Sequence, residues 1–551
     1  MAIINIKKEF FMHDAQAGGF FPKTHTNPGI KIDKFIGETG QNYIIEGIRG
    51  SGKTHILKMI NETCLNEFGE KKVLPIYVSL ASVSEWVKED LTFFRLHLYA
   101  NIVRNSISTI EHNRDKIELA GNSDLKKALK RVAQMFGLNE SENFDAILEE
   151  IKDYSDYLLT LLSYTPESFK ETNTHESEES SNIELSGDIY KIKSKLGASE
   201  RKKNSEQREV NFIGKNLAHQ NAASFIVNYF KELKKILGHN YSYLLLDECS
   251  EVSVEAQKEV FRLFKLVRGA FGTPNTQENT AYFCASVYPE PLTYYPSQTK
   301  GDSFNFEVGH DAIMEYVSID ELTDEYLLFF KELTNKRIKE FLPDEYENYM
   351  DILENEKALV LASYFANGNV RRFIEILKHA YDRLVQRRGI KESGTIDKIS
   401  AKDIEESLNS IVPQQVLSSN KLTSSDFDNL DKIIAKLTKR NKKNETENKE
   451  KSTENKLPAN LYFTVSRSEA KELGNLLMQG AIHDKNKTRV RKYYKKDGNR
   501  GSLMMLDLAT AFHDGAIDRG RAAEIFSHDL VKNAKSGYMW CQDISLTNGD
   551  D

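Results

Sequence analysis

The strongest chemical signal in the sequence is a glycine-rich segment, Gly47-Ile48-Arg49-Gly50-Ser51-Gly52-Lys53-Thr54, which fits the pattern GxxxxGK[ST]. Glycines at this spacing let consecutive backbone N–H groups point at an anion, and a helix that begins here adds its partial positive charge. Lys53 would reach the β and γ phosphates of a nucleotide, and the Thr54 hydroxyl would bind Mg²⁺. An ordinary glycine-rich turn is the alternative. The predicted cofactor-binding residues in this segment are Gly47, Arg49, Gly50, Ser51, Gly52, Lys53, Thr54 and His55.

The second signal is the run Leu244-Leu245-Leu246-Asp247-Glu248, an apolar strand that ends in two carboxylates. Asp247 would join Thr54 as a group that holds Mg²⁺ and its water shell. Glu248 would orient and deprotonate the attacking water, which makes it a catalytic candidate together with Lys53. An Asp-Glu pair after a strand can also be a turn or a helix cap. After a phosphate-binding loop, the pair favours hydrolysis of the γ-phosphate over nucleotide storage.

These residues need a parallel sheet to position them. The glycine-rich loop follows a short apolar run and precedes a helical pattern over residues 54–68, and further apolar runs recur along the chain. Strands that alternate with helices predict an α/β fold with a parallel sheet. Residues from about 89 to 238 are too many for one crossover, so we expect a largely helical insertion there. The predicted strands are 42–46, 73–80, 243–246, 281–287 and 313–319.

The segments GIRGSGKT, LLLDE, AYFCASVYP and Gly368-Asn-Val-Arg-Arg-Phe373 together resemble the AAA+ ATPases of the origin-recognition and initiator type. The resemblance covers residues 30–382. It implies that Ser286, at the end of a strand, senses the γ-phosphate, and that Arg371 opens a lid helix as a second sensor, with Arg372 as a possible replacement. A solvated arginine is the alternative at position 371. The preference for adenine over guanine rests on the same resemblance.

The family also implies an arginine contributed in trans by a neighbouring subunit, and hence a homo-oligomer. Arg262 and Arg268 lie on the predicted helix 252–268, and Arg268, at its exposed end, is the possible arginine finger. A cation at a helix C-terminus is also favoured by the helix dipole alone, which is the alternative explanation.

The C-terminal third carries a local positive charge. Residues 485–500 hold eight cations and one anion, with a turn signal at Asp497-Gly498 between two predicted strands. A preceding helix, 466–477, begins with a capping box at Ser466 and Glu469. This pattern resembles a winged helix, which initiator-type ATPases often carry after the lid. We expect contact with double-stranded DNA, although a solvated face or a wing used for protein contacts would give the same pattern. The predicted DNA-binding residues are Lys487, Arg489, Arg491, Lys492, Lys495, Lys496 and Arg500.

The expected organisation has four parts. Residues 1–319 form an AAA+-like P-loop core, 320–395 a helical lid, 396–510 a winged-helix-like domain, and 511–551 a C-terminal helical tail. Two polar, charged stretches of low complexity are expected to be mobile, at 165–182 and at 437–456.

Composition limits the function classes. The chain has 551 residues, 75 Lys and Arg against 82 Asp and Glu, and a net charge of −7, so nucleic-acid contact requires a local patch. Four scattered cysteines argue against a disulfide framework or zinc ribbon. No apolar window approaches the roughly 20 residues of a membrane span, and the start lacks a signal-peptide core, which predicts a cytoplasmic protein without membrane contact.

The sequence therefore predicts an ATP- and Mg²⁺-dependent switch that couples slow ATP hydrolysis to DNA binding and self-assembly, in mobile-element defence or DNA maintenance. One alternative is a STAND-type signalling ATPase that recognises a protein and assembles with a separate effector. Another is a P-loop protein that binds nucleotide without turnover.

Overall fold

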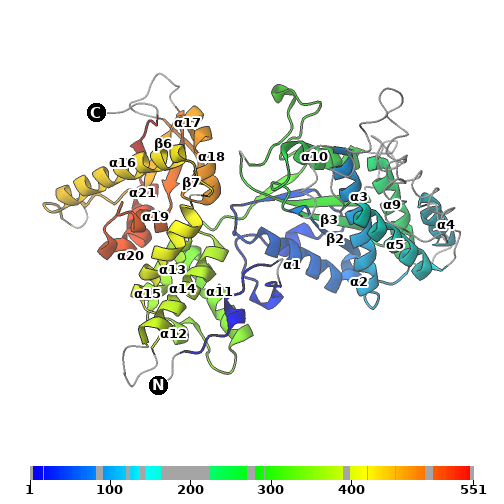
Figure 1. Cartoon of the computed structure of the whole chain (residues 1–551), viewed down its shortest axis with the longest axis horizontal. Helices are drawn as coiled ribbons and strands as arrows, with labels where there is room; N and C mark the ends of the chain where they lie inside the picture. The colour runs from blue at the N-terminus through cyan, green and yellow to red at the C-terminus, as the bar shows by residue number, and fades with distance from the viewer. Residues whose placement is uncertain are drawn as a thin grey trace. The chain divides into compact units, whose positions relative to one another are not determined.

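The protein consists of two compact units, each with its own hydrophobic core (Figure 1). The sheet unit holds residues 30–46 and 56–316, and the lid unit holds residues 1–29, 47–55 and 317–551. No helix in the described part of the chain is long and apolar enough to cross a membrane. The structure is a computed structural model of the whole chain and describes residues 4–15, 18–81, 91–119, 125–136, 143–162, 222–269, 280–290, 292–388, 397–418, 420–452, 455–490 and 500–546.

The sheet unit is built on five strands in the order β2-β3-β4-β1-β5, and every neighbouring pair is parallel. All seven residues of β3 are buried, as expected for a strand covered on both faces. The predicted α/β fold with a parallel sheet is therefore confirmed. The strands are β1 (Tyr43–Glu46), β2 (Val73–Ser79), β3 (Tyr241–Asp247), β4 (Ala281–Val287) and β5 (Ile313–Tyr316).

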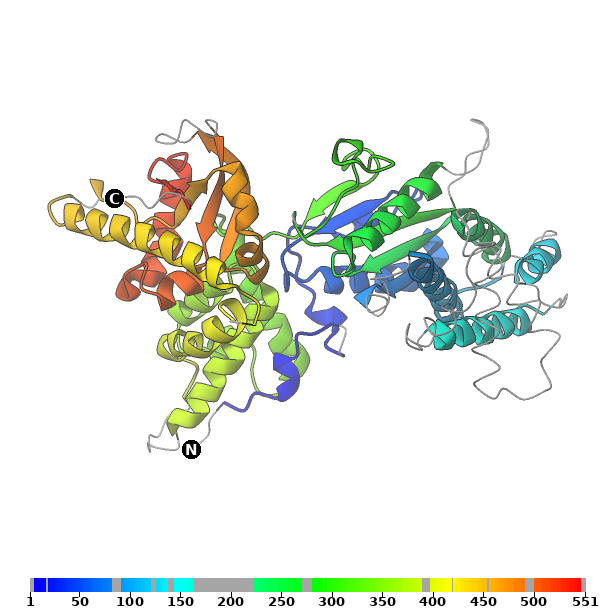
Figure 2. The ribbon, with the colours of Figure 1, turned by 45° about the horizontal axis from the view of Figure 1, so that its top comes forward.

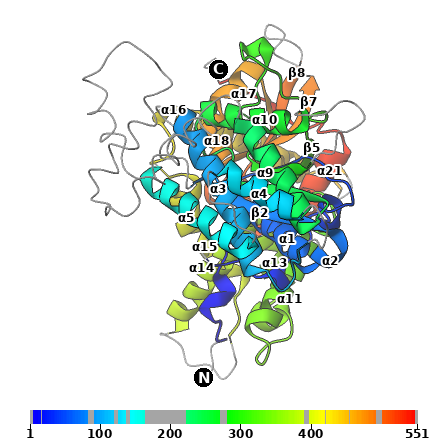
Figure 3. The ribbon, with the colours of Figure 1, turned by 90° about the vertical axis from the view of Figure 1, so that its right-hand side faces the viewer.

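Helices cover both faces of this sheet (Figure 2). Among the described residues, four helices lie between β2 and β3 in the chain, where the insertion is predicted, and they gather together in Figure 3. The expected mobile stretch 165–182 lies outside the described residues. The helices are α1 (Lys53–Asn66), α2 (Phe68–Lys71), α3 (Leu91–His112), α4 (Leu125–Met135), α5 (Phe144–Leu162), α9 (Ala222–Leu237) and α10 (Val254–Gly269).

The lid unit begins with helices that pack around an apolar core, and the N-terminal segment runs along them. The Arg337 guanidinium donates to the backbone oxygens of Phe10 at 2.8 Å and Met12 at 2.6 Å, which fixes this segment against α11. The helices are α11 (Glu325–Phe341), α12 (Tyr349–Ile352), α13 (Glu356–Ala366), α14 (Val370–Arg388) and α15 (Ala401–Ile411), followed by a π-helical turn (Val412–Val416).

The C-terminal domain follows the winged-helix order of helix, strand, two helices and a hairpin. The predicted capping box at Ser466 is confirmed, but the predicted helix 466–477 is two short helices that meet at buried Leu473. The hairpin strands pair antiparallel with an irregularity between Asp484 and Lys487. The elements are α16 (Ser424–Asn448), β6 (Tyr462–Val465), α17 (Arg467–Glu472), α18 (Gly474–Gln479), β7 (Ile482–Val490) and β8 (Arg500–Leu506).

The expectation of a mobile linker at 437–456 is wrong for its first part, because α16 continues to Asn448. Three asparagines lie on the inner face of α16, where apolar residues would be expected, and they bind the extended segment 457–460. Asn441 Nδ2 donates to the Asn460 oxygen at 3.0 Å, Asn444 to Pro458 at 2.9 Å and Asn448 to Leu457 at 2.8 Å. Amide side chains thus give this charged helix a buried face.

The end of the chain adds a strand as well as helices, so the expected helical tail is only partly helical. β9 pairs parallel with β6 and completes a sheet in the order β7-β8-β6-β9. Aromatic contacts join this region to the lid, with the Phe365 ring 5.0 Å from Phe512 and 5.5 Å from Phe526. The elements are α19 (Leu508–His513), α20 (Ala522–Glu524), a π-helical turn (Ile525–Asp529), α21 (Leu530–Lys535) and β9 (Gln542–Asp543).

Candidate nucleotide site and wing

The glycine-rich segment forms a tight loop that opens α1. Gly50 and Gly52 have φ angles of 84° and 99°, in the left-handed region that glycine adopts without strain. Lys53 is the first residue of the helix, and its Nζ donates to the backbone oxygens of Gly47 at 2.7 Å and Ile48 at 3.0 Å. This is the loop-and-helix arrangement that binds anions through backbone N–H groups.

Close approach also requires glycine in this loop. A Cβ at Gly47 would lie 2.6 Å from Ser51 Oγ, and a Cβ at Gly50 would lie 2.3 Å from Asn369 Oδ1. Within the described residues, Ser51 Oγ is buried without a hydrogen-bond partner. A cradle of glycines around an unsatisfied hydroxyl fits a phosphate group as ligand.

Aromatic side chains lie against the first turn of α1. The His55 ring stacks on His25 with centroids 5.3 Å apart and an interplanar angle of 10°, and the Phe20 ring meets His55 edge-on at 5.2 Å. Burial, and then the charge of Lys336, lowers the pKa of His25, which favours its neutral form. Sequence reasoning found no base-recognition motif before the loop, and it did not connect Phe20 and His25 with His55 because they lie more than twenty residues before Gly47.

In the sheet unit, Asp247 lies at the end of β3 with both carboxylate oxygens hydrogen-bonded. Ser286 Oγ, from β4, donates to Oδ1 at 2.5 Å, and the Tyr77 hydroxyl, from β2, donates to Oδ2 at 2.7 Å. Asp247 is 1% exposed and Ser286 also 1%. Three neighbouring strands therefore fix the orientation of this carboxylate.

Glu248 follows with an unusual backbone. Its φ of 61° lies in the left-handed region, which is uncommon for a residue other than glycine and is concentrated at functional sites. Its N–H donates to Ser286 Oγ at 3.0 Å, and its carboxylate accepts from Ser79 Oγ at 2.7 Å. Sequence reasoning missed Ser79 and Tyr77, although Ser79 is the register partner of Asp247 in the β2–β3 pair.

The two arginines at the start of α14 have different environments. The Arg371 N–H donates to the Gly50 oxygen at 3.2 Å, and Arg371 Nε is buried without a hydrogen-bond partner among the described residues. Arg372 instead forms a buried ion pair with Asp507, Nη1 to Oδ1 at 2.6 Å. The possible replacement of Arg371 by Arg372 is therefore not supported, whereas the sensor role of Arg371 stays a prediction.

The possible arginine finger Arg268 is the penultimate residue of α10, and its side chain lies outside the described residues. Its neighbour on the same helix, Arg262, pairs with Glu259 at 3.5 Å. The trans role of Arg268 stays a prediction from the sequence.

Three predicted DNA-binding residues are described, and all three lie on the hairpin. Lys487 and Arg500 are exposed and Arg489 is half-buried. Lys487 Nζ lies 3.3 Å from the Tyr538 hydroxyl, and Arg500 Nη1 lies 3.4 Å from Thr488 Oγ1. The hairpin therefore carries three of these cations, and Tyr538, in the segment before β9, contacts one of them; their role in DNA binding stays a prediction. The remaining predicted residues, Arg491, Lys492, Lys495 and Lys496, lie outside the described residues.

Comparisons with known proteins give structural similarity only. No protein-family model matches the sequence, and no curated protein matches it. The chain is similar to the ORC2 protein of Aeropyrum pernix, determined as ADPNP and ADP complexes, with 12% identity, 92% of this chain and 93% of that chain covered, and a TM-score of 0.35. It is also similar to the Aeropyrum pernix ORC1 protein in complex with DNA, with 12% identity, coverage of 91% and 89%, and a TM-score of 0.30. Both TM-scores are below 0.5, so the function proposed below rests on the residues of this chain.

Proposed function

We propose that this chain is an AAA+-type ATPase that binds ATP with Mg²⁺, hydrolyses it slowly, and couples its nucleotide state to DNA binding. The loop at the start of α1 carries the proposal, because Gly50 and Gly52 adopt left-handed backbone angles directly before Lys53. Such a loop suits the phosphates of a nucleotide. Thr54 and Asp247 would hold Mg²⁺, which supplies charge neutralisation at the phosphates when it is bound.

Hydrolysis is supported by the carboxylate of Glu248. Asp247 is fixed by Ser286 and Tyr77, so the next residue presents its carboxylate from a defined backbone position. A carboxylate at this place can accept a proton from a water that attacks the γ-phosphate. The hydrogen bond from Ser79 occupies one oxygen of Glu248, which supports slow turnover.

The nucleotide-binding part is tested with the purified full chain, wild type, Lys53→Ala and Glu248→Gln. Lys53→Ala is expected to weaken ATP binding at least about tenfold. Glu248→Gln is expected to keep ATP binding while turnover falls by about 10²-fold or more. Glu251→Gln, an exposed glutamate in the same turn, serves as the control. A Glu248→Gln protein that hydrolyses ATP at the wild-type rate would contradict the catalytic role.

DNA binding is proposed for the cations of the hairpin. The double variant Lys487→Glu/Arg500→Glu should weaken binding to double-stranded DNA and reduce the salt dependence of log Kd by about one for each phosphate that the hairpin no longer neutralises. The control is Lys442→Glu/Lys449→Glu, two exposed lysines of α16 and its C-terminal end whose reversal changes the net charge equally. Equally weakened binding in both variants would show a non-specific charge effect and no role for the wing.

The proposal also includes self-assembly and an arginine finger at Arg268. The biological setting that we propose is mobile-element defence or DNA maintenance. Mass in solution with and without ATP tests self-assembly. ATP turnover that depends on protein concentration and falls with Arg268→Ala tests the arginine finger.

A further inference from the structure

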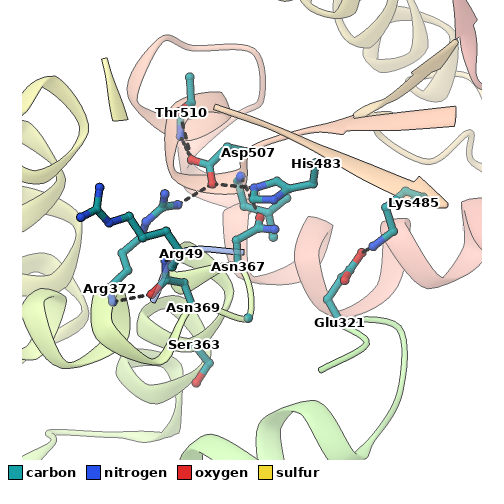
Figure 4. Close-up of polar contacts among 12 residues, drawn as sticks. Arg49, Glu321, Ser363, Asn367, Asn369, Arg372, His483, Lys485, Asp507 and Thr510 are labelled. Carbon is teal, nitrogen blue, oxygen red and sulfur yellow. Dashed lines mark hydrogen bonds and ion pairs between the residues drawn. The ribbon is translucent and has the colours of Figure 1, made fainter. Parts of the chain in front are cut away.

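A buried polar cluster joins the start of α14 to the C-terminal domain (Figure 4). Its centre is Asp507, which is fully buried and caps α19 by accepting from the Thr510 N–H at 3.0 Å. The other oxygen, Oδ1, accepts from Arg372 Nη1 at 2.6 Å and lies 3.1 Å from His483 Nε2. Since His483 lies on β7, this carboxylate connects the lid helix to the first strand of the wing hairpin.

The same end of α14 also binds the glycine-rich loop. Asn369 Nδ2 donates to the Arg49 oxygen at 2.8 Å, and Asn369 Oδ1 accepts from the Arg372 N–H at 3.0 Å. The Arg371 N–H donates to the Gly50 oxygen at 3.2 Å. A Cβ at Gly50 would lie 2.3 Å from Asn369 Oδ1, so the loop and this amide are in direct contact.

These contacts form an uninterrupted series with little free space. Arg372 is 6% exposed and Asp507 is fully buried, so neither side chain can move independently of its partners. A backbone change at Arg49 or Gly50 must be accommodated at Asn369, and from there at Arg372. The series is short, and each step is a hydrogen bond or an ion pair.

A second ion pair offers a comparison within the same protein. Lys485, also on β7, pairs with Glu321 at 2.5 Å, and both side chains are largely buried. The Lys485–Glu321 pair fixes β7 to the segment before α11, whereas His483 on β7 is joined to α14 through Asp507 and its ion pair with Arg372. The two pairs have similar burial and different connections.

We propose that Asn369 and Arg372 are positioning residues that couple the conformation of the glycine-rich loop to the wing strand β7 through Asp507. The coupling acts in both directions, because an equilibrium linkage between two sites is reciprocal. Phosphate binding at the loop would bias the wing, and an event at the wing would bias the loop. The contacts between the loop, Asn369, Arg372 and Asp507 do not depend on whether the chain is an ATPase. That this link makes DNA binding depend on nucleotide rests on the proposed function.

The first experiment needs neither nucleotide nor DNA. Hydrogen–deuterium exchange of the full chain is compared for wild type, Asp507→Asn and Glu321→Gln. Asp507→Asn removes the charged acceptor for Arg372, and we expect peptides covering residues 47–55 to exchange about fivefold faster or more. Glu321→Gln should accelerate exchange in β7 and leave residues 47–55 unchanged. Faster exchange of the loop in both variants, or in neither, would overturn the proposal.

Conservative substitutions at Asn369 and Arg372 separate loss of the link from simple unfolding of the variant. Asn369→Asp keeps the acceptor for the Arg372 N–H and replaces the donor to the Arg49 oxygen with a charged acceptor, so the variant should fold and still accelerate exchange in the loop. Arg372→Lys keeps a cation opposite Asp507 and should restore slower exchange relative to Arg372→Met. If Arg372→Lys and Arg372→Met behave alike, the ion pair does not carry the link.

The second experiment adds ATP and Mg²⁺. In the wild type, nucleotide should slow exchange at residues 47–55 and at β7, and in Asp507→Asn only at residues 47–55. Absence of protection at 47–55 in the wild type would refute the nucleotide site itself, while the first experiment would still decide the link. Protection at β7 that survives in Asp507→Asn would refute the link and leave the nucleotide site intact.

Discussion

The Ser79 hydroxyl donates a hydrogen bond of 2.7 Å to the Glu248 carboxylate, which fixes the proposed catalytic base to the end of β2. A carboxylate held in this way has one oxygen fewer to orient a water. The pair also joins two strands whose registered partners are Ser79 and Asp247. The rate of hydrolysis should therefore respond to the residue at position 79.

We predict that Ser79→Ala raises kcat, because it removes the hydrogen bond that the Ser79 hydroxyl donates to the charged Glu248 carboxylate. A rise of up to about tenfold corresponds to about 1.4 kcal/mol, within the range of such bonds. The affinity for ATP should not change, because Ser79 is not in the predicted nucleotide-binding set. Steady-state turnover with ATP titrated separately measures both. Ser79→Thr keeps the hydroxyl and should behave as wild type, and a lower kcat in Ser79→Ala would show that Ser79 aligns the base.

Gly50→Ala should weaken nucleotide binding. The alanine would have to keep a φ of 84°, and its Cβ would lie 2.3 Å from Asn369 Oδ1. Both effects displace the loop, so binding of a fluorescent ATP analogue should weaken by about 5- to 150-fold, since strain of this kind costs about 1–3 kcal/mol. The control is Gly69→Ala, in α2, where no atom lies within 4 Å of the new Cβ. That substitution should leave binding unchanged and stabilise the helix by up to about 1 kcal/mol.

Arg372→Met should destabilise the lid unit by about 3–5 kcal/mol, the usual cost of leaving one partner of a buried ion pair unpaired. The uncompensated group is the carboxylate of Asp507. Arg387→Met provides the comparison on the same helix, because Arg387 is 45% exposed and pairs with Asp403 at 3.2 Å. Its loss should cost about 0–1 kcal/mol, because Arg387 is exposed and the buried Asp403 carboxylate keeps the Ser400 N–H and hydroxyl as donors. Urea unfolding of both variants measures the difference, and equal midpoints would contradict it.

Buried His239 should make the sheet unit sensitive to mild acid. Burial lowers the pKa of His239 to about 3, whereas an unfolded histidine has a pKa of about 6.5. Between these values the unfolded state binds a proton that the folded state does not, so stability falls as the pH falls below about 6.5. At pH 5 the loss is about 2 kcal/mol. His239→Gln should show a smaller loss of stability between pH 7 and pH 5, measured by urea unfolding, and an equal loss would contradict this assignment.

Replacing a buried asparagine on the inner face of α16 should lower the free energy of unfolding. Asn441→Ala removes donors to the oxygens of Asn460 and Ala516, and it removes the acceptor of the Asn460 N–H. Buried groups left without partners should cost about 1–3 kcal/mol. Lys442→Ala, the exposed neighbour, should change stability by less than about 0.5 kcal/mol. Thermal unfolding compares the two, and similar values would show that α16 is held by other contacts.

Much of the fold could be predicted because its signals are local. The strands are short apolar runs, and β4 has the predicted bounds 281–287. The glycine-rich loop is a fixed spacing before a helix, and the hairpin is marked by Asp497-Gly498 between two strands. Each of these signals lies within about ten residues of sequence.

The remaining features depend on partners far away in the chain. Arg372 follows Arg371 directly in the sequence, and only the fold shows that Arg372 forms an ion pair with Asp507, 135 residues later. The helical continuation of α16 was hidden because polar asparagines are normally a sign of solvent exposure, and their partners are backbone oxygens of an extended segment. Ser79 acquires its role from strand register, which the sequence of β2 alone does not contain.

The shared aromatic core around Phe365, Phe512 and Phe526 also bears on how this chain can evolve. Domains that meet only at a polar surface can be exchanged by recombination, and each keeps its own fold. Here a new C-terminal domain would have to supply rings that match the surface of α13. A change of the C-terminal domain is therefore tied to matching changes in α13, whereas substitutions within the hairpin leave this aromatic core intact.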